Sequence, residues 1–168
     1  HIAGKLENGV TVHNFYVPAG GDVADREVNE KFGQKLDYLT EMRDAFHAAA
    51  PQKSILVGDL NIAPREDDVW DHKKLLKVVS HTPIEVEALA QTQDAGKWVD
   101  ITRQDIPEGL LYSWWSFIHN RSATGIDDDG AGLATGQHLG IKQMQCVVLK
   151  RNHHDEMITA LNQLAERN

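Results

Sequence analysis

The stretch that decides the fold is ILVGDLNIAP, residues Ile55–Pro64. It opens with apolar residues, as expected for a short strand in the middle of a sheet that is covered on both faces. The strand then ends on a glycine, the carboxylate of Asp59 and the amide of Asn61. Because side chains two apart in an extended chain point to the same side, these two should project together. Ligands of open α/β sheets bind at this end of the strands, so the stretch marks a candidate site.

Asp59 and Asn61 admit two interpretations. A carboxylate that only accepts hydrogen bonds, beside an amide that donates and accepts, can orient a water and hold an anionic oxygen. That pair suits metal-assisted hydrolysis of a phosphate ester. However, Asp and Asn also bond to their own backbone, and G-D-x-N-x-x-P is rich in turn formers. On spacing alone, a turn is the simpler interpretation.

The elements around this stretch follow from periodicity. Val10–Val17 alternates loosely and is rich in β-branched and aromatic residues, which predicts a strand. Lys31–Ala50 carries apolar residues at spacings of three and four, which predicts a helix, and a proline follows it. Thr82–Gly96 predicts a second long helix. Thr82 would cap it, a proline takes the first helical position, and Glu85 completes a capping box.

The other segments give weaker signals. We expect a short helix over Asp71–Val79, a short strand or extended segment over Trp98–Ile101, a strand over Leu110–Phe117, a strand or helix over Ile141–Leu149, and a helix over Asp155–Arg167. This order of strands and helices predicts an α/β fold, with a sheet packed against helices.

Composition narrows the class of protein. The chain has 168 residues, 41% of them hydrophobic and 25% charged, which fits one globular domain. No apolar run approaches the ~18 residues of a membrane span, so we expect no membrane partner. The net charge of -8 argues against a general polyanion binder but not against a nucleic-acid enzyme. Cys146 is the single cysteine, which fits a reducing, cytoplasmic setting.

Five stretches form a series in a fixed order along the chain. They are NFYVPAGG (14–21), GDLNIAP (58–64), DVWDHKKLLKVVSHTP (68–83), WVD (98–100) and YSWWS (112–116). In this combination the chain resembles the exonuclease III/AP endonuclease family, in its bacterial exodeoxyribonuclease III branch. The resemblance extends over about residues 8–117, some two-thirds of the chain.

The resemblance implies a fold and an activity. The family fold is a four-layer α/β sandwich of the endonuclease/exonuclease/phosphatase type, with two β-sheets faced by helices. The implied function is that of a DNA-repair phosphodiesterase, an exodeoxyribonuclease III with abasic-site endonuclease activity. Such enzymes use Mg²⁺, with Mn²⁺ as the alternative ion. The implied partner is double-stranded DNA with abasic sites or 3′ ends.

The resemblance also implies roles for particular residues. The hydroxyl of Tyr16 would sit at the scissile phosphate, Asp59 would activate the attacking water, and Asn61 would help to bind the phosphate. Asp59 and Asn61 are also tentative metal ligands. Trp114 or Trp115 would pack on the deoxyribose, and since neighbouring strand residues face opposite ways, one of them at most should reach DNA. Without the resemblance, Tyr16 and both tryptophans would be interpreted as core residues.

The family pattern is incomplete in this chain. The family's metal-binding Asn and Glu lie in an N-terminal half that is not matched. After Phe117 we find neither its R-L-D-H-I-W type segment nor its final S-D-H. We therefore expect residues 1–117 to be the central and later part of an exonuclease III-like catalytic domain, within a truncated sandwich. Residues 118–168 would be a divergent tail, of the kind that a frameshift or a fusion produces.

Two further functions stay open beside the nuclease. One is a catalytically dead remnant that acts as a DNA-binding or interaction module. The other is a family phosphatase with a non-DNA substrate. A divided sandwich leaves an unpaired strand edge and an uncovered face, so we expect self-association through the exposed sheet edge. With few metal ligands, Mg²⁺ should bind weakly, and we expect little or no nuclease activity.

Overall fold

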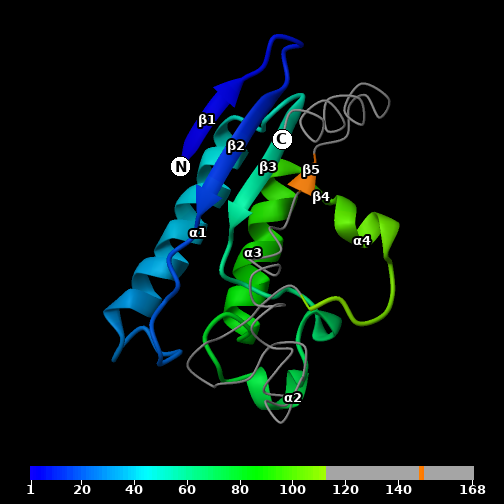
Figure 1. Cartoon of the computed structure of the whole chain (residues 1–168). Helices are drawn as coiled ribbons and strands as arrows, with labels where there is room; N and C mark the ends of the chain where they lie inside the picture. Colours follow the sequence, from blue (N-terminus) through cyan, green and yellow to red (C-terminus); the bar gives the residue numbers. More distant parts are fainter. Residues whose placement is uncertain (113–147, 150–168) are drawn as a thin grey trace, which may run out of the picture.

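The computed structural model describes residues 1–112 and 148–149, which form one five-stranded sheet with helices (Figure 1). The strands, in the spatial order β1-β2-β3-β5-β4, are β1 (Ile2–Lys5), β2 (Thr11–Tyr16), β3 (Ser54–Asp59), β5 (Val148–Leu149) and β4 (Val99–Asp100). The helices are α1 (Glu30–Ala48), α2 (His72–Leu75), α3 (Pro83–Gly96), α4 (Ile101–Asp105) and the short 3₁₀ helix η1 (Glu66–Asp68). The predicted α/β fold is confirmed.

The pairing of β2 with β3 is the parallel part of the sheet, and α1 is the crossover between them. The other pairs, β1–β2, β3–β5 and β4–β5, are antiparallel. The register of β2 and β3 runs from Thr11 opposite Ser54 to Tyr16 opposite Asp59. Both parallel strands therefore end side by side.

Helices α1 and α3 cover one face of β2 and β3, behind the strands in the view of Figure 1. Phe46 of α1 makes edge-to-face contacts with Phe15 of β2 and with Trp98, at 5.8 and 5.5 Å between ring centres. The buried residues of this core cluster are Phe15, Val17, Leu39, Met42, Phe46, Leu56, Leu60, Ile62, Leu89, Ala95 and Trp98. Burial of this apolar surface is the main force that holds the helices to the sheet.

Both long helices begin at side-chain caps, of which the cap of α3 was predicted and the cap of α1 was not. The side chain of Asn29 accepts a bond from the N–H of Lys31 at 3.1 Å, which caps α1. At the start of α3 the N–H of Thr82 donates to Glu85 Oε2 at 3.2 Å, so the predicted capping box is confirmed. The helix ends at Gly96, as expected. A side chain would not fit at this position, because a Cβ would lie 2.1 Å from Trp98 Nε1. The left-handed residue that closes it is Lys97.

The weaker signals have mixed outcomes in the structure. The predicted helix over Asp71–Val79 shortens to α2, whereas the short strand expected within Trp98–Ile101 is confirmed as β4. The described part of Leu110–Phe117, up to Tyr112, forms no strand. Strand β1 was not predicted, because all four of its side chains are exposed and show no alternation.

Other expectations fall partly or wholly outside the described residues. Within Ile141–Leu149 the described pair is the strand β5. Trp114, Trp115 and Asp155–Arg167 are not among the described residues. Of the helices in residues 1–112, none is long and apolar enough to cross a membrane.

Candidate functional site

Tyr16 and Asp59 are the last residues of the parallel strands β2 and β3, and the register places them opposite each other. Tyr16 is 64% exposed, so the interpretation as a core tyrosine is wrong. Asp59 is half-buried. A tyrosine and an aspartate therefore occupy neighbouring positions at the carboxyl edge of the sheet, the place where ligands bind in open α/β folds.

Gly58 lets the two strand ends approach closely. Its φ of +128° lies in the region that favours glycine, and a Cβ at this position would lie 1.9 Å from the carbonyl oxygen of Phe15. One residue further, the N–H of Val17 donates to the carbonyl oxygen of Asp59 at 2.8 Å. The pairing thus continues past the end of β2 and fixes the backbone of Asp59.

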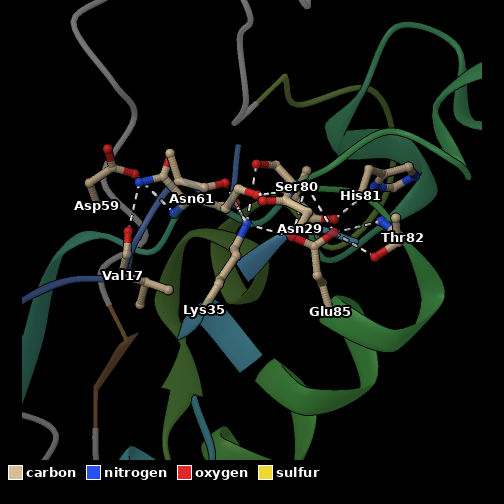
Figure 2. A network of polar contacts seen from close by, with 12 residues as sticks. Val17, Asn29, Lys35, Asp59, Asn61, Ser80, His81, Thr82 and Glu85 are labelled. Carbon is tan, nitrogen blue, oxygen red and sulfur yellow. Dashed lines mark hydrogen bonds and ion pairs between the residues drawn. The ribbon is translucent and has the colours of Figure 1, made fainter. Parts of the chain in front are cut away.

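Asp59 and Asn61 form a turn rather than an extended pair (Figure 2). The N–H of Asn61 donates to Asp59 Oδ1 at 2.9 Å, and Asn61 has a φ of +50°. This conformation corrects the expectation that an extended chain projects both side chains together, and it confirms the turn interpretation. Short polar side chains such as Asn tolerate this backbone and bond to it locally.

The turn holds the side chain of Asn61 as well as its backbone. Asn61 Nδ2 donates to the carbonyl oxygen of Val17 at 2.8 Å, which ties the turn after β3 to the loop after β2. A primary amide has two N–H donors, and this bond uses one of them. The second N–H of Asn61 can therefore still donate to a phosphate oxygen while the turn is formed.

A buried ion pair lies beneath the turn, between Lys35 of α1 and Glu85 of α3 (Figure 2). Both side chains have no solvent exposure. Burial lowers the pKa of Lys35, and the neighbouring carboxylates of Glu85 and Asp59 oppose that shift. Sequence reasoning assigned Glu85 only to the cap and missed Lys35. The available signal was a lysine on the apolar face of a helix, three residues after Phe32 and four before Leu39.

The described residues do not fit a complete magnesium site. Among residues 1–112 there is no group of three or more His, Cys, Asp or Glu side chains that could hold a metal ion. Asp59 supplies one carboxylate, with Oδ1 already bonded to the N–H of Asn61. Mg²⁺ sites in proteins use one or two carboxylates together with waters and substrate phosphates. The tentative assignment of Asp59 and Asn61 as metal ligands thus stays a prediction.

Comparison with known proteins gives a likeness of structure only. No model of a known protein family matches the sequence, and no curated protein sequence matches it. The chain is similar to an AP endonuclease from Archaeoglobus fulgidus, at 22% identity with a TM-score of 0.64, and to a 3′-5′ exonuclease (NExo) from Neisseria meningitidis, at 23% identity with a TM-score of 0.63. Each alignment covers 87% of this chain and 50% of the other.

A further match is the AP endonuclease LMAP from Leishmania major, at 25% identity with a TM-score of 0.52, covering 66% of this chain and 36% of that one. The fold of the chain matches half of the AP endonuclease structure and half of the 3′-5′ exonuclease structure. The chain spans about half the length of the first two solved structures. The sheet with α1 and α3 is thus one half of the endonuclease/exonuclease/phosphatase sandwich, which confirms the predicted fold class.

Proposed function

We propose that this chain acts on the DNA backbone, as an exonuclease III-type phosphodiesterase that cuts at abasic sites and removes nucleotides from 3′ ends. The observation that carries the proposal is the pairing of Tyr16 with Asp59 at adjacent carboxyl ends, with Asn61 locked beside them. The structural likeness to AP endonucleases and to a 3′-5′ exonuclease supports it. A relative of the same fold, a 3′ phosphatase NExo, was solved bound to a product DNA hairpin.

Each of the three side chains has a defined task in the proposed hydrolysis. Asp59 takes a proton from a water, whose oxygen forms the new bond to phosphorus. The P–O3′ bond breaks, and the leaving oxygen keeps the electron pair and gains a proton. The hydroxyl of Tyr16 and the second amide N–H of Asn61 donate to the phosphoryl oxygens, where negative charge grows in the transition state.

Mg²⁺, or Mn²⁺, is the proposed cofactor by resemblance to the family, and it would neutralise charge on the phosphate when bound. Because the described residues do not complete a site for it, the function also needs ligands beyond Asp59. The same observation favours one alternative, a catalytically dead remnant that binds DNA or another protein. Each function predicts a different outcome in a cleavage assay.

The test is cleavage of a labelled duplex with one abasic site, in Mg²⁺ and then in EDTA. The chain is compared with Asp59→Asn, which keeps an acceptor oxygen for the N–H of Asn61 but removes the carboxylate charge. Asp44→Ala is the control, because this carboxylate lies on α1 with 62% of its side chain exposed. Cleavage that needs both metal and Asp59 would support the proposed function and would overturn the expectation of little or no activity in this chain. A folded sample with no cleavage would support the remnant instead.

A further inference from the structure

We propose that Lys35 is the positioning residue of the site, which holds the loop after β2 and the turn after β3 in one arrangement. For its effect on catalysis, this inference rests on the proposed function. The structural part stands alone, because it concerns how the Tyr16 and Asp59 ends of the strands are kept together.

The ammonium group of Lys35 reaches three separate loops (Figure 2). It donates to the carbonyl oxygen of Asn61 at 2.8 Å, to that of Ala19 at 3.3 Å, and to Ser80 Oγ at 3.3 Å. Ala19 lies three residues after Tyr16, Asn61 lies two after Asp59, and Ser80 precedes α3. The ammonium group also pairs with Glu85, so four acceptors share its three donors, and one buried cation joins both halves of the site to the start of a helix.

Glu85 completes the arrangement on the other side of Lys35. Its carboxylate accepts the N–H of Ser80 at 2.9 and 3.0 Å and the N–H of Thr82 at 3.2 Å, and it also accepts the hydroxyl of Thr82. The charge of Lys35 is therefore matched by a carboxylate that is itself fully bonded. The loops that carry Ala19, Asn61 and Ser80 are thus all bonded to this ion pair.

Stability alone is a poor explanation for this pair. Replacing a buried ion pair by apolar side chains of similar volume is often neutral or stabilising. An apolar side chain at position 35 would nevertheless leave the carbonyl oxygens of Ala19 and Asn61 without this donor. The stem of Lys35 also shapes the loop after β2, because a Cβ on Gly20 would lie 2.9 Å from Lys35 Cδ. Lys35 thus contacts the Tyr16 loop with both its charge and its stem.

Hydrogen exchange of single amides tests the proposal without DNA or metal. In the double variant Lys35→Met/Glu85→Gln, both charges are gone and Gln still offers an acceptor to the N–H of Ser80. We expect exchange at least tenfold faster at Val17 and Ala63, whose amides donate to Asp59 O and Ser80 O. The internal control is Thr11, which donates to Lys53 O at the opposite end of the same strands and should not change.

Other outcomes overturn the proposal. Equal acceleration at Val17 and Thr11 would mean that Lys35 contributes only global stability. No acceleration at any of these amides would mean that the loops keep their conformation without Lys35. If the double variant does not fold, Ser80→Ala removes one partner of Lys35 and keeps the ion pair. It should accelerate exchange at Ala63 a few-fold and leave Thr11 unchanged, and an unchanged Ala63 would refute the positioning role.

The effect of the double variant on catalysis is measured in a separate cleavage assay. If the unmodified chain cleaves DNA, the double variant should lose at least tenfold in kcat with KM little changed, because the backbone that carries Tyr16 and Asp59 moves while the DNA-binding surface stays. An unchanged kcat would overturn the positioning role. If the unmodified chain does not cleave, the proposed function fails, and the exchange data still decide the structural part.

Discussion

Replacing Gly58 by alanine should be among the most damaging small changes in the described part of the chain. The new Cβ would lie 1.9 Å from the carbonyl oxygen of Phe15, 2.6 Å from Asn14 Oδ1 and 2.9 Å from the carbonyl carbon of Phe15. Two of these atoms belong to the backbone of β2, which cannot rotate out of the way. The strands must therefore separate at the point where Tyr16 faces Asp59.

The expected cost has two parts. The closest contact is about 1.5 Å short of the 3.4 Å at which ordinary contact begins, and overpacking of this kind costs about 1–3 kcal/mol. A φ of +128° adds a backbone penalty for a residue with a Cβ, of about 1–2 kcal/mol. We expect Gly58→Ala to lose about 2–5 kcal/mol, a large share of the roughly 5–15 kcal/mol that stabilises a typical domain.

The assay is urea unfolding followed by tryptophan fluorescence, with two matched glycines as controls. Gly4→Ala meets nothing within 4 Å and should change the unfolding free energy by less than about 0.5 kcal/mol. Gly9→Ala also meets nothing but has a φ of +83°, so it measures the backbone penalty alone. If Gly58→Ala costs no more than Gly9→Ala, the argument from the close strand approach is refuted.

Three further predictions follow from other contacts. Burial lowers the pKa of His13 below 6.5, so the folded state binds fewer protons than the unfolded one. Thermal stability should therefore fall as the pH drops from about 6.5 through the folded pKa. A melting series on His13→Asn should show a smaller fall. Asp68 and Arg103 form a buried ion pair, so Asp68→Ala should lower the free energy of unfolding in urea by about 3–5 kcal/mol. The double variant Asp68→Ala/Arg103→Met should lose less, because no buried charge is left unpaired, and equal losses would contradict this. Strand β1 is a sheet edge whose Ile2 is 76% exposed, so light scattering should find dimers that Ile2→Lys weakens; a monomer at every concentration would count against this edge.

Strong periodicity and capping signals account for what could be predicted. The strand around Phe15, the helix from Lys31, the central strand from Ser54 and the helix after Thr82 all appear within a few residues of their predicted bounds. Each buries one clear apolar face or carries a recognisable cap.

Features that depend on distant backbone atoms could not be predicted. The acceptors of Lys35 lie 16, 26 and 45 residues away in the sequence, and two of them are carbonyl oxygens, which every residue possesses. The left-handed backbone of Asn61 was open to interpretation because Asn occurs in extended and turn segments alike. The motif correctly placed Asp59 at the end of a strand, but the turn decides how the candidate side chains are held.

The crossover from β2 through α1 to β3 also sets the order in which the site can form. Tyr16 and Asp59 stand 43 positions apart in the sequence, and only the parallel pairing of their strands brings them together. Contacts of such long sequence separation are paid for in chain entropy and form slowly during folding. A substitution in α1 that delays its docking on the sheet would therefore slow the appearance of the site without touching either residue.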